Sequence, residues 1–258
     1  MREPIGVIGC GAVGSQIEKL LAGGGYKVEK YDPPQGYSDQ ERINDNCLVS
    51  FLALPTPLEP NSGFLDTALI SETLEWLNTP LVIIRSTINL GDITKWASQT
   101  DKEICYSPAW GPGETASHPF RDMREDKFVV VAGSPSSRGM ALEIYKHCYP
   151  STVKFLQMAG IEAEILKLWE NSYLGMVVNF FQELSDVCEF HGADYYTVRE
   201  AMGEDPRIGR WGSFPMGGWQ SKCLAKDIPV AVSSAMGNAP LLEAVLKINE
   251  RQGYGQQS

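Results

Sequence analysis

The chain has 258 residues, is 43% hydrophobic and carries a net charge of −10, so it can bury one large core or two small ones. Its lysines and arginines form no dense block. The composition therefore disfavours nucleic-acid binding, which needs a basic surface against phosphates. No apolar run approaches the roughly eighteen residues of a membrane span, and the amino terminus lacks the basic and apolar regions of a signal peptide. We therefore expect a cytoplasmic protein without membrane contact.

The cysteines and histidines are too dispersed to predict a disulfide framework or a metal site. No two cysteines form a CxxC pair, so reduced thiols are the simpler expectation and no metal is predicted. The residues concerned are Cys10, Cys47, Cys105, Cys148, Cys188, Cys223, His118, His147 and His191.

A glycine-rich loop near the amino terminus has the features of a dinucleotide-binding turn. The apolar segment Ile5–Ile8 predicts a short strand, and Ala12–Leu21 has apolar residues at helical spacing. Between them, Gly9 permits the tight turn, Gly11 lets the backbone approach a pyrophosphate, and Gly14 allows close packing of helix on strand. Backbone amides and the helix amino terminus supply the positive end that a pyrophosphate needs. We expect the cofactor to contact Gly9, Gly11, Ala12, Val13 and Gly14.

An acidic residue at the end of the second predicted strand indicates which dinucleotide binds. The segment Tyr26–Tyr31 predicts that strand, and Asp32 follows it, eighteen residues after Gly14. A carboxylate there can accept hydrogen bonds from a ribose diol and would repel a 2′-phosphate, so NAD is favoured over NADP. The alternative is a glycine-rich turn with an incidental acid, but strand, loop, helix and acid occur in the required order.

Further strands alternate with helical or mixed segments, which is the pattern of a parallel, doubly wound α/β sheet. We expect residues 1–157 to form one Rossmann domain of this kind. The predicted strands are Cys47–Leu54, Leu81–Arg85, Glu103–Tyr106 and Lys127–Ala132.

Two of these strands end in loops that can contribute to a ligand site. In Leu54-Pro55-Thr56-Pro57 the prolines stop the strand at the carboxyl edge, the side on which such sheets bind ligands. In Arg85-Ser86-Thr87-Ile88 two hydroxyls lie at the same edge. Taken alone, each loop could also be an ordinary strand-ending turn. The residues that we expect to contact the cofactor here are Pro55, Thr56, Ser86 and Thr87.

The second half of the chain predicts an all-helical domain over residues 158–258, built on one long helix. From Ile161 to about His191 the apolar residues recur with helical spacing. Only Gly175 could interrupt this helix, because glycine is a poor helix former.

Two polar residues on this helix suggest chemistry. Lys167 and Asn171 are four residues apart, so they share a face. A buried lysine with an amide one turn away can hold an oxyanion or a catalytic water. The alternative is a surface lysine that pairs with Glu164 or Glu170.

A cysteine late in the chain is a candidate nucleophile. Lys222 and Lys226 place positive charge beside the Cys223 thiol, which favours the reactive thiolate. The preceding Gly217-Gly218 suggests a loop where backbone lies close to a ligand, and Asp227 could act as a base toward water. The alternative is that Cys223 is a small core residue, as unpaired cysteines often are.

In combination, these motifs resemble the nucleotide-sugar dehydrogenase family, typified by UDP-glucose 6-dehydrogenase and GDP-mannose 6-dehydrogenase. The resemblance covers nearly the whole chain. Its specific part is Asp205-Pro206-Arg207-Ile208-Gly209 followed by the cysteine segment. The Lys–Asn helix and the Lys–Asp pair are shared with the wider group of 3-hydroxyacid and 6-phosphogluconate dehydrogenases. The other matching segments are the glycine loop, Leu54-Pro55-Thr56-Pro57, Ser86-Thr87 with Gly91, and Asn249-Glu250-Arg251-Gln252.

The resemblance implies a role for each matching catalytic residue. Cys223 would be the covalent nucleophile of a second oxidation, which passes through a thiohemiacetal and a thioester. Lys167 and Asn171 would stabilise oxyanion character and order a water. Asp227 would help to activate that water, and Thr87 would lie near the reacting sugar.

Other residues are implied in substrate binding, and here the sequence also departs from the family. Arg207 would reach the substrate site of a two-fold-related partner, in a homodimer built on the long helix. Gly218 and Glu114 would line the substrate site. After Ser107-Pro108 the family typically has a glutamate and a second one four residues later, but this chain has Ala109 and Gly113, with Glu114 displaced by one. The carboxylates associated with acid–base work and hydrolysis are therefore missing or moved.

Two further departures concern the sugar and the nucleotide. The family's Gly-Gly-Ser ahead of the cysteine is replaced by Gln220-Ser221-Lys222, which puts long polar side chains where backbone should meet a sugar ring. Family members normally continue into a second Rossmann-like domain that binds the substrate's nucleotide, whereas this sequence stops at Ser258. We therefore expect a short form, unless another chain supplies that domain.

Three functions are compatible with these features. The first is an NAD-dependent oxidoreductase that converts the primary alcohol of a sugar or nucleotide sugar toward the acid, as in the synthesis of polysaccharide precursors. The second is a single-step dehydrogenase of a smaller hydroxyl substrate, which the short length and the missing glutamates favour. The third is a non-catalytic NAD-binding regulator of a full-length relative.

Overall fold

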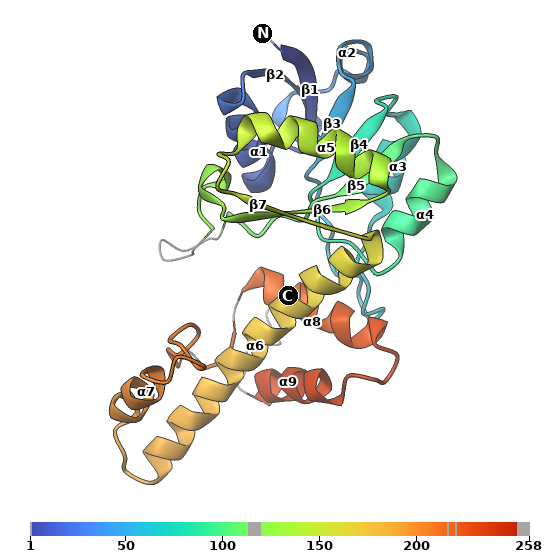
Figure 1. The fold of residues 1–258 in the computed structure, drawn as a ribbon. Coiled ribbons are helices and arrows are strands. Elements are labelled where there is room, and N and C mark those ends of the chain that lie inside the picture. The colour runs from blue at the N-terminus through green and yellow to red at the C-terminus, as the bar shows by residue number, and fades with distance from the viewer. Residues whose placement is uncertain (1, 113–119, 216, 220, 252–258) are drawn as a thin grey trace. The chain divides into compact units, whose positions relative to one another are not determined.

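The computed structural model describes residues 2–112, 120–215, 217–219 and 221–251. The chain falls into two compact units, Met1–Pro57 with Leu65–Leu166, and Leu58–Phe64 with Lys167–Ser258. The long helix α6 (Gly160–Phe190) begins in the first unit and continues into the second (Figure 1).

The first unit is built on a seven-stranded sheet with the order β2-β1-β3-β4-β5-β6-β7 (Figure 1). Neighbouring strands pair in parallel except β5 and β6, which are antiparallel. The strand order reverses beside β1, and ligands of such sheets bind at the carboxyl ends of the strands at this point. The predicted doubly wound Rossmann sheet is confirmed. The strands are β1 Arg2–Ile8, β2 Tyr26–Tyr31, β3 Val49–Leu52, β4 Leu81–Ile84, β5 Glu103–Tyr106, β6 Phe128–Gly133 and β7 Lys154–Met158.

The sequence does not predict the last strand, β7, or the antiparallel pairing of β6. β7 is an edge strand, and none of its residues is fully buried. It therefore lacks the continuous apolar run by which the buried strands are recognised. The direction of β6 depends on long-range pairing, which local residue patterns do not encode.

Helices cover both faces of this sheet, because alternate residues of each strand point to opposite faces. Val129 and Val131 of β6 join one core cluster with residues of α1 and α5, whereas Val130 joins a second cluster with residues of α2, α3 and α4. Each cluster is an apolar layer between helices and sheet. The helices of this unit are α1 Ala12–Gly23, α2 Gln40–Asn46, α3 Ala68–Trp76, α4 Asp92–Gln99 and α5 Pro135–Cys148, with short 3₁₀ turns η1 Pro33–Gln35 and η2 Met123–Glu125.

The second unit is helical, as predicted, and consists of most of α6 with α7 (Tyr195–Gly203), α8 (Lys222–Ser234) and α9 (Pro240–Arg251). Gly175 does not interrupt α6. A Cβ atom at this position would lie 2.4 Å from Cδ1 of the buried Ile228, so the glycine permits close packing of α6 on α8. Although α6 is 31 residues long, neither it nor another helix in the described part of the chain is apolar enough to cross a membrane.

The residue that follows β4, Arg85, is a buried arginine that bonds to the residue that follows β5, Ser107. The Arg85 guanidinium is 4% exposed and donates hydrogen bonds to Ser107 Oγ at 2.7 Å and to Tyr145 Oη at 3.1 Å. Asp126 is also buried, and burial raises the pKa of its carboxyl to about 6, although Arg85 opposes the shift. The folded protein therefore holds a proton on Asp126 at pH values where the unfolded chain has released it.

Replacing Asp126 with Asn should change how stability depends on pH. Because the folded-state pKa lies above the unfolded value, Asp126 makes the free energy of unfolding fall as pH rises from about 4 to 6, by about 3 kcal/mol. Denaturant unfolding at several pH values should show this contribution in the wild type and not in Asp126→Asn. Equal pH slopes in the two proteins would contradict the assignment.

Candidate functional site

The glycine loop between β1 and α1 has the close contacts that its sequence predicts. Gly9 has a φ of +86°, and a Cβ there would meet the Ala53 carbonyl oxygen at 2.4 Å. A Cβ at Gly14 would lie 1.9 Å from the Gly9 carbonyl oxygen, so α1 packs directly on the loop backbone. Gly11, by contrast, is exposed, and a Cβ added to it would meet no atom of the described residues within 4 Å. The open space beside Gly11 is where a bound pyrophosphate would approach the backbone.

Asp32 is joined to this loop by a hydrogen bond. Its Oδ2 atom accepts the backbone N–H of Cys10 at 2.7 Å and the side-chain amide of Gln35 at 3.1 Å. Asp32 follows the last residue of β2, and its side chain is half-buried. The carboxylate thus lies beside the glycine loop, as a ribose-binding acid should, and it also holds the loop in place.

The two strand-ending loops are joined by their hydroxyl groups. Ser86 Oγ accepts the N–H of Leu54 at 2.9 Å and donates to the Leu54 carbonyl at 2.7 Å. Thr56 Oγ1 donates to the Thr87 carbonyl at 2.7 Å. Since a hydroxyl has a single donor, Ser86 and Thr56 retain only acceptor capacity for a ligand. Pro55 is exposed and Thr87 is half-buried.

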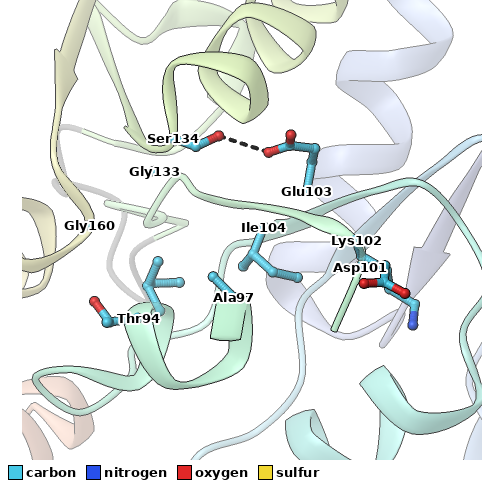
Figure 2. Close-up of a pocket in the computed structure, with 10 residues that line it drawn as sticks. Thr94, Ala97, Asp101, Lys102, Glu103, Ile104, Gly133, Ser134 and Gly160 are labelled. Carbon is cyan, nitrogen blue, oxygen red and sulfur yellow. Dashed lines mark hydrogen bonds between the residues drawn. The ribbon is translucent and has the colours of Figure 1, made fainter. Parts of the chain in front are cut away.

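The first unit also contains a pocket of about 400 Å³ that is distinct from the predicted cofactor-binding loops (Figure 2). Its lining includes Glu103 at the start of β5 and Ser134 at the start of α5, whose hydroxyl donates to Glu103 Oε2 at 2.7 Å. None of its lining residues belongs to the predicted cofactor-binding set. Within the residues that the structure describes, no group of three or more His, Cys, Asp or Glu side chains could hold a metal ion.

In the second unit, α6 and α8 bring two of the predicted catalytic residues, Asn171 and Asp227, into contact. The Asn171 side-chain amide donates to Asp227 Oδ2 at 2.5 Å, and Lys226 Nζ lies 2.6 Å from Asp227 Oδ1. The Asp227 side chain is 1% exposed. Its charge is therefore shared between an amide and an ammonium group inside the protein. Lys226, which the sequence places near Cys223, is thus paired with the adjacent Asp227 carboxylate.

Lys167 is buried on the same face of α6 rather than lying on the surface. Its side chain is 7% exposed, one turn before Asn171. Burial lowers the pKa of Lys167, and the Asp227 carboxylate opposes this shift. The Glu170 carboxylate opposes it as well. The alternative of a surface lysine is therefore wrong. Of its two suggested partners, Glu164 binds the backbone amides of Gly91 and Ile93, whereas Glu170 does interact electrostatically with Lys167.

Cys223 is exposed and lies in the first turn of α8. It is therefore not a core residue. Because Cys223 and Asp227 are four residues apart on one helix, they lie on the same face, with Asp227 bonded to Asn171. The Asp227 carboxylate and the Asn171 amide thus form a bonded pair, and Cys223 lies one turn before Asp227 on the same face of α8. This arrangement can present a nucleophile on the face that carries groups able to order water.

The structure does not bring the predicted substrate-binding residues into contact with one another. Arg207 is exposed and forms an ion pair with Asp205, with Nη2 and Oδ2 2.5 Å apart. Gly218 is buried and has a φ of +102°, a conformation that favours glycine. Glu114 and Gly113 lie outside the described residues. Ala109 packs against an apolar core cluster, so it offers no polar group where the family has a glutamate.

Comparison with known proteins identifies the relatives of this chain. Residues 161–251 match the family model described as the UDP-glucose/GDP-mannose dehydrogenase family, central domain. A UDP-glucose 6-dehydrogenase of Haloferax volcanii is 30% identical over 254 residues, which cover 87% of this chain and 57% of the relative. The chain spans about half the length of the curated relatives it matches.

Solved structures show the same fold. A UDP-glucose dehydrogenase of Pyrobaculum islandicum has a TM-score of 0.83 at 20% identity, covering 97% of this chain and 68% of that one. A 3-hydroxyisobutyrate dehydrogenase of Mycobacterium tuberculosis has a TM-score of 0.73 at 17% identity, covering 97% of this chain and 94% of that one. At these identities the likeness establishes the fold.

Replacing Gly14 with Ala should destabilise the protein, because the new Cβ would overlap the Gly9 carbonyl oxygen and force α1 away from β1. We expect the free energy of unfolding to fall by about 2–4 kcal/mol, measured by denaturant titration. Gly139→Ala is the matched control, since this glycine also lies in a helix but has open space around it. It should be neutral or stabilising, and an equal loss in both variants would contradict the packing argument.

Proposed function

The chain belongs to the UDP-glucose/GDP-mannose dehydrogenase family, and from that premise we propose that it is an NAD-dependent oxidoreductase acting on a sugar or nucleotide-sugar primary alcohol. The observation that carries the proposal is the grouping of Cys223 with Asp227, Asn171 and Lys167 on α8 and α6. Because the chain spans about half the length of its curated relatives, its activity and its substrate both belong to the proposal.

The residues of the first unit fit an NAD molecule. The open space at Gly11 can accept a pyrophosphate, and the Asp32 carboxylate beside the loop can accept hydrogen bonds from a ribose diol. When bound, NAD supplies a hydride acceptor for the alcohol carbon. Thr56, Ser86 and Thr87 lie in the loops at the carboxyl edge of the sheet, on the side expected for the cofactor.

The chemistry of the second unit fits oxidation beyond the aldehyde. The Cys223 thiolate would add to the aldehyde carbon, and protonation of the oxygen would give a thiohemiacetal. Loss of the hydroxyl proton, with transfer of the carbon's hydride to a second NAD molecule, would leave a thioester. Water then releases the acid and restores the thiol. In this proposal Lys167 balances the oxyanion charge of these steps and the Asn171–Asp227 pair orients the water; the burial of Lys167 and the hydrogen bond between Asn171 and Asp227 support these roles.

Replacing Cys223 with Ala tests this mechanism directly. With NAD and a panel of nucleotide sugars, the wild type should yield two NADH per substrate and an acid. Cys223→Ala should stop at the aldehyde with one NADH per substrate, because no thioester can form. NADH absorbance together with mass analysis of the product measures both quantities. Full acid yield from the variant would refute the covalent step.

A second prediction concerns the cofactor loop. Gly11 has a φ of −68° and free space around it, so Gly11→Ala should fold with an unchanged melting temperature. The added methyl group would occupy the space proposed for the pyrophosphate, so NAD affinity should fall by about tenfold or more. Calorimetric titration with NAD measures this loss. Unchanged NAD affinity would show that the pyrophosphate does not approach Gly11.

One observation favours the alternative of a single-step dehydrogenase acting on a smaller hydroxyl substrate. Ala109, which is half-buried against an apolar core cluster, stands where the family has a glutamate, so a carboxylate associated with acid–base work is absent at this position. One NADH per substrate from the wild type would support this alternative. NAD binding without turnover of any alcohol tested would instead support a non-catalytic regulator of a full-length relative.

We also propose a homodimer built on α6, with Arg207 reaching the partner's substrate site. Apolar side chains are exposed along this helix and would be covered in such a dimer. They are Ile161, Ile165, Trp169, Tyr173, Phe180 and Val187. The unpaired cysteines agree with a reducing compartment, so the proposal includes a cytoplasmic location.

A further inference from the structure

The helix that follows the Thr87 loop cannot cap its own amino terminus. α4 begins at Asp92, and its capping position is Gly91, which has a φ of +91°. Glycine suits this left-handed conformation but has no side chain to accept the free N–H groups of the first helical turn. Partners for these amides must therefore come from elsewhere in the chain.

Glu164 on α6 accepts two of these backbone N–H groups. Its Oε2 accepts the N–H of Gly91 at 2.6 Å and its Oε1 accepts the N–H of Ile93 at 2.9 Å. The residue is 1% exposed, and all three residues belong to the first unit. Burial raises the pKa of Glu164, while the bonds from the two amides oppose this shift. Both oxygens of one carboxylate are thus used, each on a different backbone amide.

The segment that precedes α4 is also held by hydrogen bonds of Asn89. The Asn89 side chain accepts the N–H of Leu65 at 2.8 Å and donates to the Leu65 carbonyl at 3.0 Å. Its backbone N–H donates to Asp92 Oδ2 at 3.0 Å. The segment between Thr87 and Ile93 is therefore fixed at both ends by side chains, and Glu164 is the contact supplied by α6.

We propose that Glu164 is a positioning residue for the loop that carries Ser86 and Thr87. It acts through the Gly91 and Ile93 amides and does not touch the reacting groups. The next turn of α6 after Glu164 carries Lys167, so the helix that anchors this loop is also the helix of the catalytic lysine. The catalytic consequence of this role rests on the proposed dehydrogenase function.

The role requires a carboxylate rather than any side chain of similar size. A glutamine at position 164 would have the same shape but only one acceptor oxygen, and its NH₂ group would face a second N–H donor. One of the two amides would lose its partner in a buried site. The change is local, and it leaves the glycine loop and Asp32 untouched.

Glu164→Gln should loosen the loop without removing the cofactor site. Amide hydrogen exchange, followed by NMR, should be faster at Gly91 and Ile93 by about tenfold or more. Turnover with NAD and a nucleotide sugar should show kcat lower by about tenfold with KM for NAD within about threefold of the wild type. Glu164→Asp keeps the charge and should give intermediate exchange rates, and it replaces Glu164→Gln if that variant does not fold.

Glu162→Gln is the matched control. Glu162 lies on the same helix and is exposed, and its carboxylate accepts the nearby Ala159 amide at 2.7 Å. This control should leave exchange at Gly91 and Ile93 and kcat unchanged. Unchanged exchange in the Glu164 variants, or equal kcat losses in Glu162→Gln and Glu164→Gln, would overturn the proposal. Absence of turnover in the wild type would refute the proposed function, whereas the exchange experiment would still decide the role of Glu164.

Discussion

The first unit depends on the contact between α1 and the loop that precedes it. Only a glycine fits at position 14, because the Gly9 carbonyl oxygen occupies the space that a Cβ would need. This contact brings the amino terminus of α1 against the carboxyl end of β1. The helix terminus and the exposed amides of the loop then face the side of the sheet where Asp32, Thr56 and Ser86 lie. The proposed cofactor site is a consequence of how closely these two elements pack.

A second feature is that three buried polar side chains, those of Asp227, Glu164 and Arg85, bond to residues far away in the sequence. Asp227 accepts from Asn171, 56 residues earlier, and Glu164 accepts from amides 71 and 73 residues earlier. Arg85 donates to a tyrosine 60 residues later. Leaving one member of such a pair unbonded is costly inside a protein. These contacts therefore fix how distant elements meet within each unit, and they lie close to the residues proposed for chemistry.

The departures from the family concern acid–base groups rather than the nucleophile. Cys223, Asp227, Asn171 and Lys167 are all present in the second unit, with Asn171 bonded to Asp227 and Lys167 buried. Ala109, in contrast, is part of an apolar cluster. In the proposed reaction, water activation is assigned to the Asn171–Asp227 pair. Because the nucleophile is present and a family carboxylate is absent, the number of NADH formed per substrate separates two-step from single-step oxidation, which a simple activity test would not do.

The sequence by itself determined the parts of this protein whose signals are local. The glycine loop, the strand ending before Asp32, the long α6 helix and the helical character of the second half all follow from residue spacing and conformational preference. The pairing of Lys167 and Asn171 on one face follows from helical periodicity. Only the tertiary structure decided that Lys167 is buried, that Cys223 is exposed, that Asp227 receives both Asn171 and Lys226, and that Glu164 caps α4. Burial and hydrogen-bond partners depend on which distant segments pack together, and that information is not contained in the spacing of neighbouring residues.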